Sequence, residues 1–383
     1  MGNVAIRSVE RRPVATPARP RIVWLALSEA RGHLMRAQLA ARLLAPEGID
    51  VDIVTTGAEG VAFMAEFGLR ATLISEAFSL AYDDRQNLAR VKSRAIAMRY
   101  LFSPKGCLRE MAWFDGYAAN AAMIVNDSYH PALLMSCFAN TQLSQRIVHV
   151  HGENMRRSVE STAGRGVLRS MMQTAFARST RIEIAPDATD IGSSFAGGEI
   201  YRLPPLMPAP RPASVVRAEL GVTSNDTLAV VYLNPYFRDP AIAQAIDDAT
   251  RAGYMVYAVG EGFLGRPGWR GADPALADVV AAADVFISAA GMGAVSLAKA
   301  AGVPLIAIAT DQPEQRANLA AADGMWTRIV ELGPNTRQQL VAALAAVPSI
   351  PRSNNAELAV RRSRAQWSST LRMLVDRNLS RKA

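Results

Sequence analysis

The 383-residue sequence predicts an α/β protein built from two doubly wound domains, and three observations support this fold class. Short apolar runs, long enough for buried parallel strands, alternate with helix-length segments in both halves of the chain. A proline-rich run over residues 203–212 separates the halves, because it can continue neither a helix nor a central strand. Half of the residues are hydrophobic, which is enough for the buried cores of two domains.

The apolar runs predict the strands in order. In the first half we expect strands over 22–27, 51–55, 71–74, 122–125 and 146–150. In the second half we expect strands over 228–233, 255–259, 285–288 and 305–308, followed by helical sequence over 354–376. Strands that alternate with helix-length segments imply βαβ units and parallel sheets.

These elements predict the domain organisation. We expect a flexible tail over 1–20, a first Rossmann-like domain over 21–205 and a linker over 206–213. A second Rossmann-like domain is expected over 214–353, and a C-terminal helix over 354–383 that packs back on the first domain. Ligands of such sheets bind outside the carboxyl ends of the strands, so the expected site is a cleft between the two facing domains.

The charge of the chain is +8 and is unevenly distributed. The stretch 85–109 holds seven basic residues and no acidic one: Arg85, Arg90, Lys92, Arg94, Arg99, Lys105 and Arg109. A basic balance permits nucleic acid, anionic lipid or a phosphorylated substrate as partner. No helix-turn-helix, zinc knuckle or aromatic-basic repeat is present in the sequence, so we expect no nucleic-acid partner.

The same stretch carries apolar residues at helical spacing: Leu88, Val91, Ala95, Met98 and Phe102. It is either an ordinary surface helix with a solvated basic side or an amphipathic surface that rests on an anionic membrane. No apolar run is long enough to span a bilayer, and two cysteines, Cys107 and Cys137, indicate no disulfide framework. We therefore expect a cytoplasmic protein, with peripheral contact at the inner face of the membrane as the open alternative.

Two glycines lie between an expected strand and an expected helix. Gly291 and Gly293 follow the strand over 285–288 and precede a short helix over 295–301. Without side chains they let backbone approach a ligand closely, and the helix N-terminus adds N–H donors and partial positive charge. This arrangement suits a phosphate or diphosphate, and a strand–turn–helix that needs glycine for geometry alone is the alternative.

A polar segment, 310–318, follows the next expected strand. Its hydrogen-bonding side chains are Asp311, Gln312, Glu314, Gln315 and Asn318. Such a cluster at the carboxyl end of a strand fits a polyhydroxylated ligand. The alternative is a helix whose first turn is solvated and capped by Asp311.

The order of ADVFIS (283–288), GMGAVSLAKAAGVP (291–304) and DQPEQRAN (311–318) resembles the donor half of GT-B glycosyltransferases. It is similar both to the MurG-like group and to the bacterial antibiotic and sterol glycosyltransferases. The resemblance implies that the glycine turn holds the diphosphate of a nucleotide-sugar and that the polar segment contacts the sugar. The donor-binding residues expected on this basis are Gly291, Met292, Gly293, Ala294, Asp311, Gln312 and Gln315.

The first half agrees with this resemblance. EARGHLMR (29–36) follows the first strand and resembles the Gly-His that opens the acceptor domain, where the histidine is often the general base. A neutral imidazole at His33 suits that role near pH 7. Asp127 follows another strand and resembles the aspartate that orients the base, fixes its tautomer and stabilises the imidazolium. The catalytic pair implied is His33 with Asp127; helix capping or packing is the alternative for each.

The segment HVHGEN (149–154) resembles the middle of MurG-like enzymes, and His149 and His151 share one strand face. The acceptor-binding residues expected are Gly32, His130, His151 and Asn154, with packing at the strand end as the alternative. No third ligand with motif spacing accompanies the histidines and no Asp-x-Asp pair follows a strand suitably, so we expect no metal.

Three positions depart from the pattern of the family. Leu297 and Ala294 stand where MurG-like and many UDP-sugar enzymes carry Glu and Thr, and residues 234–237, NPYF, replace a Gly/Ser-rich loop. The departures make a dTDP-sugar donor an alternative to a UDP-sugar. Tyr236 or Phe237 would stack on the base, or the loop is simply rebuilt.

The resemblance implies an inverting, metal-independent glycosyltransferase of the hexosyltransferase type, with no cofactor besides its nucleotide-sugar co-substrate. The first domain would bind a small-molecule or lipid-linked acceptor, and His33 would deprotonate its hydroxyl or amine. The second domain would bind the donor, and the glycine turn would meet the charge of the leaving diphosphate. Two alternatives stay open: a nucleotide-sugar hydrolase of the same fold, where Gly-His-x-x-Arg with Arg36 also occurs, and a partner or activator protein with a degenerate donor site.

Overall fold

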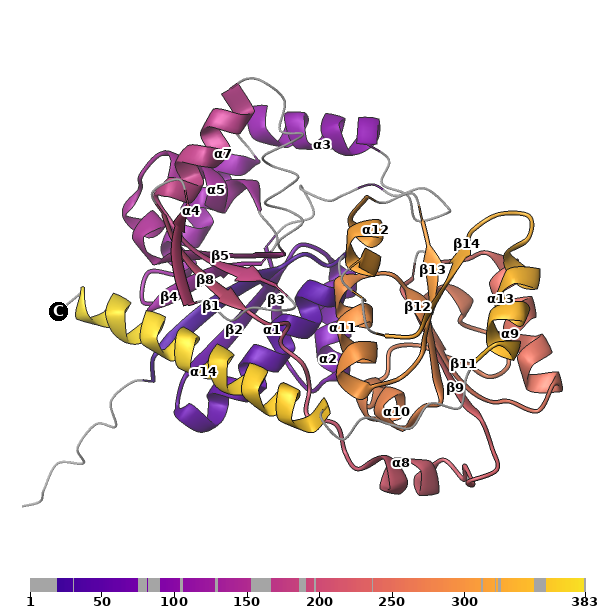
Figure 1. Ribbon diagram of the computed structural model, residues 1–383. Helices are drawn as coiled ribbons and strands as arrows, with labels where there is room; N and C mark the ends of the chain where they lie inside the picture. The colour runs from indigo at the N-terminus through magenta and orange to yellow at the C-terminus, as the bar shows by residue number, and fades with distance from the viewer. Residues whose placement is uncertain are drawn as a thin grey trace, which may run out of the picture.

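The chain forms two α/β units that lie side by side in the computed structural model (Figure 1). The structure describes residues 19–29, 31–74, 81, 90–103, 106–127, 130–152, 167–185, 191–195, 198–235, 237–310, 313–320, 322, 325–347 and 356–381. Among these residues each unit has one sheet with helices on both faces. The predicted fold class, two doubly wound α/β domains, is confirmed.

The sheet of the first unit has the strand order β3-β2-β1-β4-β5-β6-β8-β7 in the described residues. Neighbouring strands are parallel except for β7, which pairs antiparallel with β8 at the edge. The strands are β1 (Arg21–Ala26), β2 (Asp50–Thr55), β3 (Ala71–Leu73), β4 (Met123–Asn126), β5 (Ile147–Gly152), β6 (Thr180–Ile184), β7 (Ile191–Phe195) and β8 (Gly198–Leu203).

Both faces of this sheet are buried, which explains the continuous apolar sequence of β1. Trp24 points into a core with α1 (Arg31–Leu44) and α2 (Ala58–Glu66). Leu25 points to the other face, into a core formed with α3 (Arg90–Phe102), α4 (Cys107–Tyr117), α5 (Pro131–Phe138) and α7 (Val167–Ala177). Short 3-10 helices follow α1 at η1 (Ala45–Glu47) and precede β5 at η2 (Gln142–Arg146).

The sheet of the second unit is parallel throughout, in the order β11-β10-β9-β12-β13-β14. Its strands are β9 (Leu228–Leu233), β10 (Met255–Gly260), β11 (Trp269–Arg270), β12 (Val285–Ala289), β13 (Leu305–Ala309) and β14 (Thr327–Glu331). Its helices are α8 (Ala213–Glu219), α9 (Pro240–Arg251), η3 (Glu261–Phe263), α10 (Leu276–Ala282), α11 (Met292–Ala301), α12 (Pro313–Ala320) and α13 (Thr336–Ala345). Two apolar cores again cover the two faces.

The first six strands of each sheet follow one doubly wound order, so each sheet has one switch point where the strand order reverses. In the first sheet the switch point lies between β1 and β4, and in the second between β9 and β12. Crossover connections leave in opposite directions from these strands and open a crevice at their carboxyl ends. The two switch points therefore mark where a ligand is expected.

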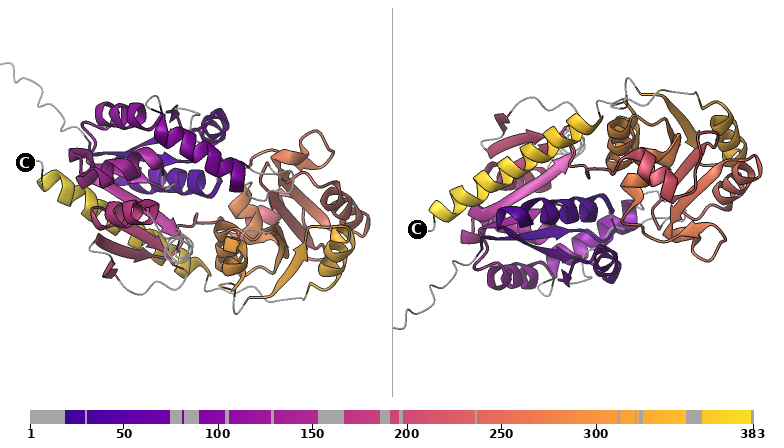
Figure 2. Two further views of the ribbon diagram at one scale, coloured as in Figure 1. Left: turned by 90° about the horizontal axis from the view of Figure 1, so that it is seen from above. Right: turned by 90° about the horizontal axis from the view of Figure 1, so that it is seen from below.

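The last helix, α14 (Ala356–Ser380), follows the second unit in sequence but packs on the first (Figures 1 and 2). Its fully buried Trp367 joins the core that contains Trp24, together with Leu371, Leu374 and Val375. The indole N–H of Trp367 donates to the carbonyl of Pro204 at 2.7 Å, just after β8. Residues 204–212 have no regular structure and lead into α8. No helix in the described part of the chain is both long and apolar enough to cross a bilayer.

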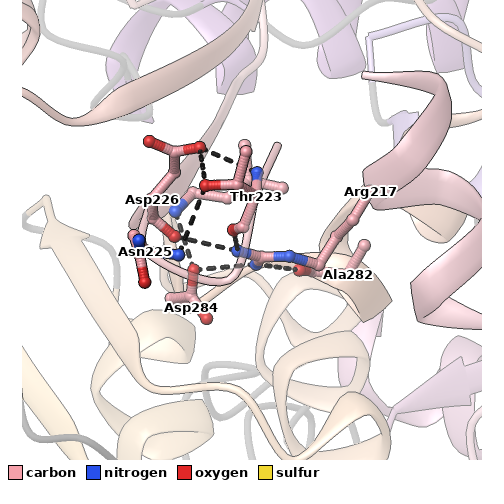
Figure 3. A network of polar contacts seen from close by, with 7 residues as sticks. Arg217, Thr223, Asn225, Asp226, Ala282 and Asp284 are labelled. Atoms are coloured by element: carbon pink, nitrogen blue, oxygen red, sulfur yellow. Dashed lines mark hydrogen bonds and ion pairs between the residues drawn. The ribbon is translucent and has the colours of Figure 1, made fainter. Parts of the chain in front are cut away.

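A network of hydrogen bonds centred on Arg217 lies at the amino-terminal edge of the second sheet (Figure 3). Arg217 of α8 donates to the carboxylate of Asp284 at 2.9 Å, just before β12. The same guanidinium donates to the carbonyls of Ala282, Thr223 and Asp226 at 3.2, 2.9 and 2.8 Å. Because these groups precede β9 and β12, the network lies at the opposite end of the sheet from the switch-point crevice.

Candidate functional site

Two of the contacts between the domains join the carboxyl edges of the two sheets. Arg31, at the start of α1 after β1, forms an ion pair with Glu261, directly after β10. Gly152 ends β5, and a Cβ placed on it would lie 2.8 Å from Cε of Met292, the first residue of α11 after β12. The two switch points therefore face each other across the boundary between the domains.

The side chains of His33 and Asp127 come together at the first switch point. His33 lies in the first turn of α1, Asp127 follows β4 directly, and β1 pairs with β4. His33 Nδ1 lies 2.9 Å from Asp127 Oδ1. The carboxylate is fully buried, whereas the His33 side chain is 31% exposed. Because a carboxylate only accepts, Nδ1 carries a proton, and in the neutral ring Nε2 keeps its lone pair for another partner.

Two further donors hold Asp127. Arg36 binds both carboxylate oxygens, with Nε at 2.8 Å from Oδ2 and Nη2 at 2.9 Å from Oδ1. The indole N–H of Trp24 donates to Oδ2 at 3.2 Å. Burial acts to raise the pKa of Asp127, but the charge of Arg36, the charge of His33 when its ring is protonated, and the hydrogen bonds from both side chains outweigh it and hold this pKa below its usual value. Asp127 is therefore a carboxylate at neutral pH although no solvent reaches it.

The partnership of Arg36 with Asp127 was not predicted from the sequence, which placed Arg36 only in the hydrolase alternative. The signal was present in its spacing. Arg36 stands three residues after His33 on α1, so both side chains share one face of the helix. A carboxylate that reaches His33 is therefore within reach of Arg36 as well.

The glycine turn lies at the second switch point, between β12 and α11. Gly291 is the N-cap of α11, with φ −70° and no side-chain hydrogen bond to cap the helix. A Cβ on Gly291 or on Gly293 would meet no atom within 4 Å. Neither a left-handed backbone nor crowding within the chain therefore explains these glycines. They leave open space in front of the N–H groups that begin α11, which suits an anionic ligand.

The polar segment after β13 supports this turn. The amide Nδ2 of Asn318 on α12 donates to the carbonyl of Ala290 at 3.0 Å, immediately before Gly291. Gln315 is buried, and its Oε1 accepts from the backbone N–H of Thr310 at 3.0 Å. These two side chains hold the loops after β12 and β13. Asp311 and Gln312 lie outside the described residues, and donor contact by Gln315 stays a prediction.

Three residues that depart from the family pattern, Ala294, Leu297 and Phe237, pack against apolar cores of the second domain. Ala294 and Leu297 are partly buried and pack against the core that contains Val295. Phe237 is buried in the opposite core of the second domain, so a base cannot stack on its ring, and the stacking interpretation stays a prediction for Tyr236 alone. Tyr236 lies outside the described residues.

The remaining histidines of the first domain are buried. His130 precedes α5, with Nε2 3.4 Å from Oε2 of Glu110. Burial lowers the pKa of His130 to about 3, so its ring is neutral. His151 stacks on Phe176 of α7, and its Nδ1 lies 3.1 Å from the carbonyl of Gly152.

His149 lies two residues before His151 on β5, and its Nε2 is 3.5 Å from Sγ of Cys137. Burial, with the charges of His151 and Arg181, lowers the pKa of His149 to about 3. Gly32 is exposed and directly precedes His33, whereas Asn154 lies outside the described residues. The acceptor contacts assigned to Gly32, His130, His151 and Asn154 stay predictions. In the part of the chain that the structure describes, no group of three or more His, Cys, Asp or Glu could hold a metal ion.

Solved structures share this fold along nearly the whole chain. The spinosyn forosaminyltransferase SpnP has a TM-score of 0.58 at 16% identity, over 93% of this chain and 99% of that one. UGT89C1 of Arabidopsis thaliana, complexed with UDP, has a TM-score of 0.58 at 14% identity, over 94% and 100%. The spinosyn rhamnosyltransferase SpnG, complexed with thymidine diphosphate, has a TM-score of 0.54 at 14% identity, over 93% and 99%.

No protein-family model matches the sequence, and no curated protein is similar to it in sequence. The likeness to the solved structures, at 14–16% identity, is one of fold. It confirms the GT-B fold that the sequence motifs predicted.

Proposed function

We propose that this GT-B protein is an inverting, metal-independent glycosyltransferase of the hexosyltransferase type. It moves a sugar from a nucleotide-diphospho-sugar to an acceptor hydroxyl or amine. One observation carries the proposal: a histidine–aspartate pair at the first switch point faces an open glycine turn at the second. General base and anion site thus lie on opposite sides of one boundary.

In this reaction His33 is the general base and Asp127 orients it. The Nδ1–H donates to the buried carboxylate, which fixes the tautomer and leaves Nε2 to take the proton of the acceptor. The acceptor oxygen or nitrogen forms a bond to the anomeric carbon while the bond to the diphosphate oxygen breaks on the opposite face. The configuration at that carbon is therefore inverted.

The leaving diphosphate carries away the electron pair of the broken bond. N–H groups at the start of α11 and the partial positive charge of the helix N-terminus stabilise the developing charge. The open space at Gly291 and Gly293 lets phosphate oxygens approach that backbone closely. This support from the backbone takes the role that a metal ion would otherwise have.

The donor is a UDP- or dTDP-sugar. Two structures of similar fold are complexed with UDP and with thymidine diphosphate. Ala294 and Leu297 pack against apolar residues, and neither side chain can form a hydrogen bond with a ribose or phosphate oxygen. This supports a mode of nucleotide-sugar binding that differs from that of MurG-like enzymes.

The acceptor, a small molecule or a lipid-linked one, binds the first domain. Helix α3 supports contact of this domain with a membrane. Val91, Ala95 and Met98 lie within about 60° of one another around the helix, and Val91 and Met98 are 85% and 54% exposed. Tyr100, on the opposite side of α3, is buried, and Lys92 and Arg99 are exposed beside the apolar stripe. Exposed apolar side chains with exposed basic ones beside them support contact with an anionic lipid surface, at the inner face of the membrane for a cytoplasmic protein.

Cosedimentation with vesicles that contain an anionic phospholipid tests this contact. We expect the wild-type protein and a Leu264→Ser control, which alters an exposed leucine of the second domain, to bind equally. We expect Val91→Ser/Met98→Ser to lose binding. Equal binding by all three proteins, or none by the wild type, would contradict the membrane contact.

The hydrolase alternative rests on Arg36. Its bidentate bond to Asp127 gives the Gly-His-x-x-Arg segment a defined structural role beside the presumed base. Mass spectrometry of the products separates the two activities. A hydrolase releases free sugar from the donor at the same rate with or without acceptor, whereas a transferase requires the acceptor.

Calorimetric binding of UDP, dTDP and GDP without added metal is the first test. We expect one nucleotide to bind the wild-type protein and not Gly293→Trp. Gly116→Trp is the matched control, because Gly116 is also a helical glycine with open space around its Cβ. If a folded wild-type protein binds none of them, the enzyme proposal falls and the degenerate partner protein takes its place. Once donor and acceptor are known, His33→Ala is expected to reduce turnover about 10²- to 10⁴-fold without loss of nucleotide binding.

A further inference from the structure

The ion pair between Arg31 and Glu261 links the two domains by two parallel hydrogen bonds. Arg31 Nε lies 3.0 Å from Oε1 of Glu261, and Nη2 lies 2.6 Å from Oε2. Such bidentate pairs fix orientation as well as distance, because both partners are planar. The Arg31 side chain is 6% exposed, so solvent screens the pair little.

Arg31 is held firmly within the first domain. Its Nη1 lies 3.3 Å from the carbonyl of Ser28 and 3.4 Å from that of Glu59. The guanidinium also lies over the ring of Phe63, 4.7 Å from its centroid. The end of β1, the start of α1 and helix α2 therefore all fix this cation, and His33 follows it by two residues on the same helix.

Glu261 is held firmly within the second domain. It follows β10, and the next residue, Gly262, packs so closely that a Cβ there would overlap the carbonyl oxygen of Phe237 in the loop after β9. Burial raises the pKa of Tyr232 to about 12, and the opposite charges of Arg31 and Glu261 both act on it. The ion pair thus lies beside the carboxyl end of β9, at the donor-side switch point.

The contact between Met292 and Gly152 lies on the other side of the proposed active site. In the first sheet β4 lies between β1 and β5, and in the second β9 lies between β10 and β12. The ion pair joins the carboxyl ends of β1 and β10. Met292, after the carboxyl end of β12, contacts Gly152 at the carboxyl end of β5 and packs against the core of the first domain. His33 and Asp127, at the β1 and β4 ends, lie between the two contacts.

We propose that Arg31 and Glu261 are positioning residues: their ion pair fixes the placement of His33 relative to the glycine turn. The proposal rests on the glycosyltransferase function proposed above. Met292 provides an apolar contact between the domains, α11 also contacts α14 and Ala272 packs against the core of the first domain, but none of these contacts has the fixed orientation of the bidentate ion pair. A misplacement of about 1 Å between base and reacting centre can reduce turnover roughly 100-fold, so the orientation that the bidentate pair imposes matters for catalysis.

The structural half of the proposal is tested by pulsed electron paramagnetic resonance, without substrate. Spin labels are placed at Asn120→Cys and Ser224→Cys, exposed positions at the amino-terminal edges of the two domains. The native Cys107 and Cys137 are buried and do not compete for the label. We expect one narrow distance distribution in the labelled parent protein and a broad or shifted one in Glu261→Ala.

Glu331→Ala is the matched control, because it removes an exposed glutamate at the end of β14, at the far edge of the same sheet. It should leave the distribution narrow. Glu261→Gln keeps the shape of the side chain and should give an intermediate result if the alanine variant folds poorly. A distribution that is unchanged in both Glu261 variants would overturn the proposal.

The catalytic half is tested by kinetics with the donor identified above. We expect Glu261→Ala to lower kcat about 10- to 100-fold while the Kd for the nucleotide changes less than twofold. Unchanged kcat would overturn the positioning role, and loss of nucleotide binding would make Glu261 part of the donor site instead. If the wild-type protein binds no nucleotide, the proposed function fails, and the distance measurement still decides whether the ion pair holds the domains in register.

Discussion

Replacing Asp127 with alanine is expected to destabilise the first domain by about 3–5 kcal/mol, the range for breaking a buried ion pair. The magnitude follows from what the substitution leaves behind. Asp127 is fully buried and accepts hydrogen bonds from Trp24, His33 and Arg36. Without it, the guanidinium of Arg36, which is largely buried, keeps its charge but loses both carboxylate oxygens. A charge left without its partner, rather than the lost bonds themselves, dominates the effect.

The double substitution Asp127→Ala/Arg36→Met separates these contributions. It removes both charges and leaves an apolar stem, so we expect it to be less destabilising than the sum of the single substitutions. The coupling energy of residues in one network is about 0.5–3 kcal/mol, and a bidentate pair should lie in the upper half of that range. Asp115→Ala, at an exposed aspartate of α4, should stay within about 0.5 kcal/mol of the parent protein.

Urea titration, followed by fluorescence and circular dichroism, measures these effects. Both domains contribute to the fluorescence signal, the first through Trp24, Trp113 and Trp367 and the second through Trp269 and Trp326, so the signal reports the unfolding of both. The reasoning is refuted if Asp127→Ala costs less than about 1 kcal/mol, or if the double substitution equals the sum of the single ones. Either result would mean that the bonds to Asp127 are not coupled in solution.

Three further outcomes are expected. Because the folded pKa of Asp127 lies below its usual value, its stabilisation is full above the unfolded pKa of about 3.9 and is lost as pH falls through the folded pKa. The gap in urea midpoint between wild type and Asp127→Asn should therefore shrink below about pH 4; a gap that widens on acidification would contradict this. Arg217→Met removes four hydrogen bonds at the amino-terminal edge of the second sheet, so we expect a loss of about 1.5–3 kcal/mol with nucleotide affinity unchanged, by thermal unfolding and calorimetry. Trp367→Ala should destabilise the first domain by about 3–5 kcal/mol, whereas Ser369→Ala, on the exposed side of α14, should have little effect; similar urea midpoints for the two would argue against the packing of α14.

The parallel sheets could be predicted because their central strands are buried on both faces and read as continuous apolar runs. Strands β1 and β9 are of this kind, and their observed bounds match the predicted ones to within one residue. Strand β6 was missed for a physical reason. Arg181 and Glu183 alternate with isoleucines there, yet both charged side chains are buried, so no continuous apolar run marks the strand. Charge in a buried strand depends on partners from other elements, such as Arg202 of β8, which donates to Glu183 at 3.1 Å.

Some features of the candidate site could likewise be predicted from the sequence, and others could not. His33 and Asp127 were predicted as a pair because each follows a strand of a recognisable motif, and the structure brings them together, although their catalytic role remains a proposal. The ion pair between Arg31 and Glu261 joins residues that are 230 positions apart. Neither residue lies in a sequence motif that predicts the other as its partner. The open space in front of Gly291 and Gly293 is likewise a property of the packed chain. Local sequence indicates which residues stand at the ends of strands, and only the assembled domains determine what faces them.

The packing of α14 on the first domain has a consequence for how the protein folds during its synthesis. The hydrophobic surface beside Trp24 that receives Trp367, Leu371 and Leu374 is made early, but these three residues are encoded about 150–160 positions after the linker. At translation rates of about 5–20 residues per second, that surface waits roughly 10–30 s for its last helix. During this interval the apolar core residues beside Trp24 lack the cover that α14 gives them in the complete chain. The second domain can complete its own core first, so folding need not follow the order in which the domains are synthesised.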